Sequence, residues 1–160
     1  MAETFGTRAT LLADLGSAVA ADAPPQLFFV FRLTGVDGFP RRLAEAVANV
    51  LIADAALVLR GQIGPASAYY RPRRDELCGL VPGPLDGVED ALVATLATHN
   101  DEHESSGLAA GFGAVLVPRE ARSVAGAIQL ADRRIAVLLP PREPVPRAGS
   151  PSGRALAAPV

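Results

Sequence analysis

The chain contains no lysine and no tryptophan, and aromatic residues make up only 5% of its 160 residues. All 15 basic residues are arginine, so no side-chain amine is available for Schiff-base chemistry. The single cysteine, Cys78, excludes an internal disulfide and is interpreted as a small buried hydrophobe rather than a reactive thiol. A net charge of −2 excludes a broad basic surface for nucleic acid, and no apolar run reaches the roughly 20 residues that span a bilayer. These absences predict a soluble, cytoplasmic protein without a nucleic-acid or membrane partner.

Hydrophobic periodicity predicts alternating helices and strands. The run Leu-Phe-Phe-Val-Phe-Arg-Leu at 27–33 is typical of a buried strand, and two short strands separated by Pro72-Arg73-Arg74-Asp75 indicate a hairpin. Pro118 is interpreted as the start of the last helix. The predicted helices are 7–21, 41–60, 85–96 and one after 118, and the predicted strands are 27–33, 67–71, 76–81 and 107–117.

This order predicts an α/β fold (an α+β sandwich), in which helices pack on a central mixed sheet. Its β-α-β-β-α-β core is the ferredoxin-like arrangement. Residues 1–139 are expected to form one domain. Residues 140–160 are rich in proline, glycine and serine and are expected to be a disordered tail.

Four short segments carry a resemblance to a known family. The hairpin sequence Arg71-Pro72-Arg73-Arg74-Asp75-Glu76-Leu77 is similar to a strand that ends in arginine, one further residue and Gly-Gly-Asp-Glu-Phe. Val36-Asp37-Gly38-Phe39 is similar to Asp-Leu-Asp-Gly-Phe, Gly111-Phe112-Gly113 with the following Val117-Pro118-Arg119-Glu120-Ala121 is similar to Ser-x-Gly and Pro-x-x-Ala, and Ala131-Asp132 matches an Ala-Asp pair. In order and spacing, residues 7–135 therefore resemble a GGDEF domain, the fold of diguanylate cyclases, in a degenerate form. The resemblance implies the nucleotidyl-cyclase palm as the form of the ferredoxin-like core.

The resemblance implies a metal site that is incomplete in this chain. A diguanylate cyclase condenses two GTP molecules with divalent metals held by carboxylates, one after the first strand and one at the third signature residue. Asp75 occupies the second position. The first is Gly35 or Arg32, depending on the alignment register, and neither side chain can bind Mg²⁺. Asp37 lies nearby and is the alternative metal ligand beside Asp75.

The resemblance also directs attention to groups that could bind a nucleotide or another anion. Arg73 and Arg74 replace the two signature glycines, and they could grip a phosphate or remain solvated turn residues. Asp54 loosely matches the family's guanine-binding aspartate, while the guanine-binding asparagine has no clear counterpart: the ungapped position is Glu45, and Asn49 is out of step.

His99 and His103 lie four residues apart in a polar stretch, 99–106, that is interpreted as a loop. On a helix they could share a face for a metal such as zinc, although nothing else in the sequence supports a metal there.

Three hypotheses follow. The first is a catalytically inactive GGDEF-like module with a regulatory or protein-interaction role in bacterial signalling, in which the vestigial signature Arg73, Arg74, Asp75, Glu76 and Leu77 catalyses nothing. The second is a sensor that binds a guanine nucleotide or cyclic dinucleotide without turnover, with Mg²⁺ present only if a nucleotide is bound. The third is a residual diguanylate cyclase that uses Asp37 and Asp75 for metal. A protein partner or a homodimer is expected in the first case, and no other cofactor is expected.

Overall fold

The structure is a computed structural model, and it describes residues 4–64 and 67–138; the expected tail, 140–160, lies outside the described residues. Helices and strands alternate along this part of the chain, as the sequence predicts. In order they are α1 (Arg8–Ala18), β1 (Gln26–Thr34), the short 3-10 helix η1 (Val36–Gly38), α2 (Arg41–Ile63), β2 (Ala68–Tyr70), β3 (Glu76–Pro82), α3 (Val88–His103), η2 (Glu104–Ser106), β4 (Ala109–Val117) and α4 (Val124–Leu138).

The four strands form one sheet in the order β2-β3-β1-β4, with β1 at its centre. All three strand pairs are antiparallel, where the sequence predicted a mixed sheet, because each crossover helix skips one position that an antiparallel strand then fills. Parallel pairing is confined to an isolated bridge in which the Gly6 backbone covers the outer edge of β2 at Tyr70. The expected ferredoxin-like fold class is confirmed.

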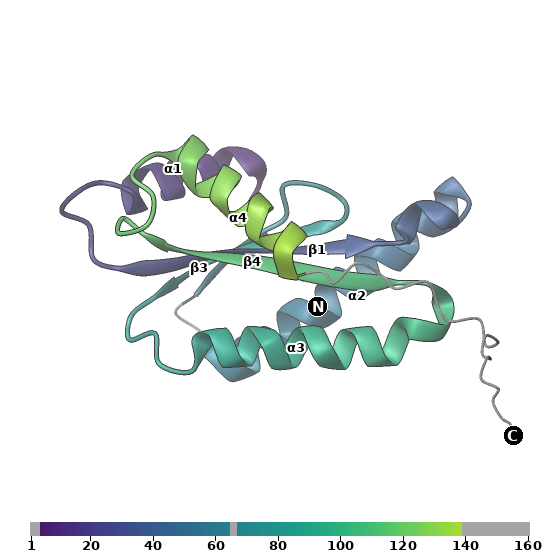
Figure 1. Ribbon diagram of the computed structural model, residues 1–160. Coiled ribbons are helices and arrows are strands. Elements are labelled where there is room, and N and C mark those ends of the chain that lie inside the picture. The colour runs from purple at the N-terminus through teal and green to yellow at the C-terminus, as the bar shows by residue number, and fades with distance from the viewer. Residues whose placement is uncertain (1–3, 65–66, 139–160) are drawn as a thin grey trace, which may run out of the picture.

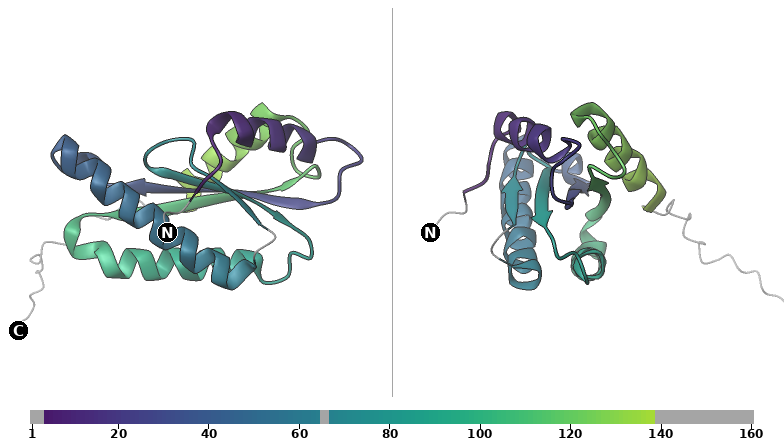
Figure 2. Two further views of the ribbon diagram at one scale, coloured as in Figure 1. Left: turned by 180° about the vertical axis from the view of Figure 1, so that it is seen from behind. Right: turned by 90° about the vertical axis from the view of Figure 1, so that its left-hand side faces the viewer.

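Helices cover both faces of the sheet: α1 and α4 pack on one face, and α2 and α3 on the other (Figure 1 and Figure 2). Because β1 is buried on both faces, its apolar run is continuous rather than alternating. Phe28 and Val30 belong to the core beneath α1 and α4, whereas Phe29 and Phe31 belong to the core beneath α2 and α3. A period-two strand thus builds two separate hydrophobic cores.

The helix α4 lies unusually close to the sheet, and a glycine explains why. A Cβ atom on Gly113 in β4 would lie 2.1 Å from the carbonyl oxygen of Ala131 in α4. Only glycine permits this approach of helix backbone to strand backbone.

Two helix boundaries differ from the sequence-based prediction by more than three residues. The helix α3 continues to His103, so the polar stretch that was interpreted as a loop is helical for its first five residues. The helix α4 begins at Val124 rather than after Pro118, because the Ser123 hydroxyl accepts a hydrogen bond from the Gly126 N–H at 3.0 Å and caps the helix there. No helix among the described residues is both long and apolar enough to cross a membrane.

Candidate functional site

The hairpin tip between β2 and β3 has a defined structure, although Arg73 and Arg74 replace the two glycines of the family signature. The Arg71 guanidinium donates two hydrogen bonds to the carbonyl oxygen of Arg74, at 2.7 and 3.3 Å, and the Glu76 N–H closes the turn on the Arg73 carbonyl at 3.2 Å. Partial burial lowers the pKa of Arg71, and the carboxylates of Glu45 and Asp75 oppose that shift. The Arg71 side chain therefore stabilises the turn by hydrogen bonding to its backbone.

The side chain of Asp37, on η1, extends to this tip, where its partner is the guanidinium of Arg74. Its Oδ1 accepts a hydrogen bond from Arg74 Nη2 at 2.7 Å, although the aspartate side chain is 94% exposed. The fold thus brings Asp37, Arg74 and the half-buried Asp75 into one region at the end of β1. A guanidinium on the carboxylate competes directly with any metal ion that would use it.

The carboxylates that remain at the hairpin tip are those of Asp37 and Asp75. Mg²⁺ takes about six oxygen ligands in near-octahedral geometry, usually one or two carboxylates together with phosphates and water. Among residues 4–64 and 67–138, no three His, Cys, Asp or Glu side chains converge to hold a metal ion.

The backbone around Gly35 explains why an acidic side chain could not be placed at this position without rearrangement. Its φ of +92° is the left-handed region, and a Cβ there would lie 2.2 Å from the carbonyl oxygen of Gly107, at the turn before β4. Any side chain at this position would have to displace that backbone. The position that the first alignment register gives to the metal carboxylate is therefore closed by main chain.

Arg32, which the alternative register gives to that carboxylate, belongs to an ion-pair network on the opposite face of the sheet. Its Nε donates to Glu76 Oε2 at 2.8 Å, and its Nη2 donates to Asp132 Oδ1 on α4, also at 2.8 Å. Glu76 is 7% exposed. Burial alone would lower the pKa of Arg32, but the hydrogen bonds to Asp132 and Glu76 outweigh it and raise that pKa.

This network is the feature that the sequence-based prediction missed. Glu76 was assigned to the signature and Asp132 to the Ala-Asp pair, with no partner for either. The signal that could have found them is the charge of Arg32 inside an otherwise apolar strand, since a buried charge needs a counter-ion.

The remaining sequence candidates lie elsewhere. Asp54 is exposed on α2, thirteen residues after Arg41 and therefore about 20 Å further along the helix axis. It acts electrostatically on His99, raising a pKa that burial lowers more strongly. His99 and His103 do share a face of α3, with ring centroids 4.8 Å apart, but the described chain supplies no third metal ligand beside them.

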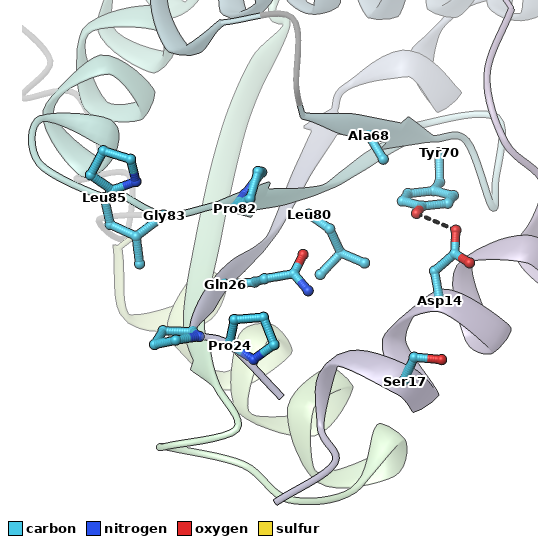
Figure 3. A pocket seen from close by; sticks show the side chains of 12 residues that line it. Asp14, Ser17, Pro24, Gln26, Ala68, Tyr70, Leu80, Pro82, Gly83 and Leu85 are labelled. Carbon is cyan, nitrogen blue, oxygen red and sulfur yellow. Dashed lines mark hydrogen bonds between the residues drawn. The ribbon is translucent and has the colours of Figure 1, made fainter. Parts of the chain in front are cut away.

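A further hollow lies at the other end of the sheet. It has a volume of about 730 Å³ and is bounded by the start of β1, the end of β3 and one side of α1 (Figure 3). Its walls are largely apolar, and the Tyr70 hydroxyl donates to Asp14 Oδ2 at 2.6 Å beside it. The one carboxylate that lines this groove, Asp14, is thus already hydrogen-bonded to Tyr70.

Comparison with known proteins identifies the fold. No protein-family profile and no curated protein sequence matches the chain. Among solved structures, the GGDEF domain of YfiN (TpbB) from Pseudomonas aeruginosa superposes with a TM-score of 0.62 at 20% identity, covering 86% of this chain and 88% of that one. A microbial GGDEF domain described for its interaction with cyclic di-GMP gives 0.61 at 15% identity, with 82% and 86% covered. The diguanylate cyclase SiaD from P. aeruginosa, in complex with its activator SiaC, gives 0.62 at 12% identity, with 82% and 54% covered.

The chain therefore has the fold of a GGDEF domain, as its motifs predicted. At these identities the likeness concerns the fold alone, and the function has to be argued from the site.

Proposed function

We propose that this chain is a GGDEF-like module of bacterial signalling that does not make cyclic di-GMP and acts through contacts with a protein partner in the cytoplasm. The observation that carries the proposal is the ion pair between Arg74 and Asp37, which places a cation where the surviving carboxylates would need to hold a metal. A protein role is supported by one structural neighbour, SiaD, which was solved with its activator.

The physical argument concerns charge. Condensing two GTP molecules places negative charge on phosphate oxygens in the transition state, and carboxylate-held metal ions stabilise that charge by several kcal/mol. Each 1.36 kcal/mol lost is a tenfold loss of rate. Without the first carboxylate, and with Asp37 paired to Arg74, the described residues offer less of this stabilisation than a full set of carboxylates would.

A second candidate is binding of a guanine nucleotide or cyclic dinucleotide without turnover, with Mg²⁺ entering only together with a nucleotide. It is favoured by Arg73, whose side chain is exposed at the hairpin tip and makes no ion pair with any described residue. An arginine fork binds phosphate through two parallel hydrogen bonds. The structural neighbour described for its interaction with cyclic di-GMP, a microbial GGDEF domain, supports this candidate.

The deciding experiment is a cyclase assay with GTP and either Mg²⁺ or Mn²⁺, using Asp75→Ala as the matched control. We expect no cyclic di-GMP from either protein, including at high enzyme concentration. Product from the wild type above that of Asp75→Ala would reject the proposal and establish the residual cyclase that uses Asp37 and Asp75.

Nucleotide binding is measured separately by thermal shift with GTP, GDP and cyclic di-GMP, with and without Mg²⁺. A ligand at a hundredfold excess over its Kd stabilises the fold by about 2.7 kcal/mol, which is a readily visible shift. If the second candidate is correct, Arg73→Ala with Arg74→Ala removes the shift without unfolding the protein. A shift that survives both substitutions would place the ligand elsewhere.

A further inference from the structure

A small cavity lies beneath α1 and α4, beside the hairpin tip. It has a volume of about 60 Å³, and its apolar wall includes Phe28 and Val30 from the core on that face of the sheet. Three arginine side chains also line it: Arg8 at the start of α1, Arg32 on β1 and Arg73 at the tip. We call this cavity the arginine pocket. Like charges repel more strongly beside a low-dielectric wall, so three guanidinium groups around one cavity favour an anion between them.

Arg32 supplies a donor whose orientation is already fixed. Its Nε donates to Glu76 Oε2 at 2.8 Å and its Nη2 donates to Asp132 Oδ1 at 2.8 Å. These bonds leave its other terminal nitrogen, Nη1, without a hydrogen-bond partner among residues 4–64 and 67–138. A guanidinium that two carboxylates hold in place loses little conformational freedom when it binds a further group.

Arg8 and Arg73 supply charge that the described chain does not neutralise. Both are exposed, and neither makes an ion pair with any described residue. Arg8 is also the first residue of α1, where the helix dipole adds positive potential. The two carboxylates that line the arginine pocket, those of Glu76 and Asp132, are both bonded to Arg32. The pocket therefore has an excess of positive charge in a chain whose net charge is −2.

We propose that the arginine pocket binds a single phosphate group, to whose oxygens Arg8, Arg32 and Arg73 donate hydrogen bonds. Planar guanidinium groups match the geometry of a phosphate, and hydrogen bonds between ionised partners are the stronger kind. A volume of about 60 Å³ is far below the roughly 300–1,000 Å³ of pockets that enclose a whole small molecule. The ligand is therefore inorganic phosphate, or the phosphate of a monoester whose organic part stays outside the cavity.

The arginine pocket is distinct from the ion pair at the outer side of the tip. Arg74 does not line the cavity, and its Nη2 donates to Asp37 Oδ1 at 2.7 Å. The nucleotide candidate above combines Arg73 with Arg74, whereas the arginine pocket combines Arg73 with Arg8 and Arg32. This inference goes beyond both proposed functions, because it requires neither cyclase activity nor nucleotide binding.

The first test is a titration of the full chain with orthophosphate, followed by ¹H–¹⁵N nuclear magnetic resonance. Chloride keeps the ionic strength constant, because salt screens the attraction between arginine and phosphate. We expect saturable shifts of the amide signals of Arg8 and Arg73 and of the Nε–H signal of Arg32, with a Kd of about 1 mM. The Arg32 signal is a usable probe because its Nε–H is hydrogen-bonded to Glu76. A wild type without saturable shifts up to about 20 mM phosphate would overturn the proposal.

Substitutions then locate the binding. Arg8→Ala and Arg73→Ala should each weaken phosphate binding at least about fivefold, since each removes a charge-assisted hydrogen bond. Arg122→Ala is the matched control: Arg122 is also exposed and without an ion pair to any described residue, but it lies before α4 and does not line the cavity. Arg122→Ala and Arg74→Ala should each change the affinity by less than about twofold. Equal effects of Arg8→Ala and Arg122→Ala, or a loss with Arg74→Ala alone, would overturn the proposal.

A second titration, with glycerol 3-phosphate, identifies the source of the phosphate group. Binding within about threefold of orthophosphate, weakened by the same two substitutions, would show that the ligand is a monoester with its organic part outside. Binding of orthophosphate alone would assign the pocket to free phosphate. Binding of neither would overturn the proposal. None of these outcomes alters the cyclase assay, which tests the proposed inactivity by itself.

Discussion

A buried histidine makes the stability of this fold depend on pH. His99, on α3, is 7% exposed and packs edge-on against Phe31 at a ring separation of 5.6 Å. Its Nε2 is buried and has no hydrogen-bond partner among the described residues. Burial, reinforced by His103, lowers the pKa of His99 to about 4, while Asp54 opposes the shift.

The sign follows from proton linkage. The unfolded chain binds a proton at His99 with an ordinary pKa of about 6.5, and the folded chain binds it only near 4. The unfolded state therefore holds more protons at intermediate pH. The contribution of neutral His99 is fully present above pH 6.5 and is lost progressively as the pH falls toward 4. Between pH 7 and pH 5 the loss amounts to about 2 kcal/mol, a large fraction of the stability of a small domain.

The assay is urea unfolding followed by far-ultraviolet circular dichroism at pH 7.0 and pH 5.0. We expect the wild type to lose about 2 kcal/mol between the two conditions, and His99→Leu, which fills a similar volume without a titrating group, to lose less than half as much. His103→Gln is the control, because it changes the neighbouring half-buried histidine and leaves His99 in place. Equal losses for the wild type and His99→Leu would refute the assignment of the pH dependence to His99.

Three further results are expected. Gly35→Ala should destabilise the fold by about 1–3 kcal/mol in urea unfolding, because its Cβ would meet the Gly107 carbonyl, whereas Gly38→Ala, with nothing within 4 Å, should change stability by less than about 0.5 kcal/mol. Arg32→Met should lower the free energy of unfolding by about 3 kcal/mol or somewhat less, because it leaves Glu76 buried without its cation, while the partial exposure of Arg32 screens the pair. Adding Glu76→Leu should recover much of this loss, and no recovery would contradict the pairing. Gly35→Asp should create no Mn²⁺ site by electron paramagnetic resonance, and tight Mn²⁺ binding by that variant would show that the Gly107 backbone can yield.

The fold could be predicted from the sequence because its central elements are locally consistent. The run at 27–33 is dominated by phenylalanine, valine and leucine, and it forms the middle of β1. The hairpin tip at 72–75 lies where the proline and the cluster of charges interrupt two short strands. In both places local propensity and the tertiary environment favour the same structure.

The details that were missed depend on contacts between distant residues. The pairing of Arg32 with Glu76 requires the register of β1 against β3, which places these two residues opposite each other. The start of α4 depends on a turn in which Glu120 accepts the Leu116 N–H at 2.8 Å and pairs with Arg134 on the helix. Pro118 alone predicted an earlier start, and the competing side-chain hydrogen bonds decide otherwise.

The two acidic residues of the signature, Asp75 and Glu76, lie in different environments. They therefore differ in what they indicate about activity. Glu76 points to the face covered by α1 and α4, where it neutralises Arg32 together with Asp132, so its presence is explained by the needs of the core. Asp75 lies at the tip near Arg71, and its side chain makes no ion pair with any residue of 4–64 or 67–138. The scaffold itself therefore accounts for Glu76 and Asp132, because removing either would leave Arg32 with only one of its two counter-ions. Signature residues that also stabilise the scaffold are evidence of the fold, whereas only the residues at the hairpin tip bear on catalytic chemistry.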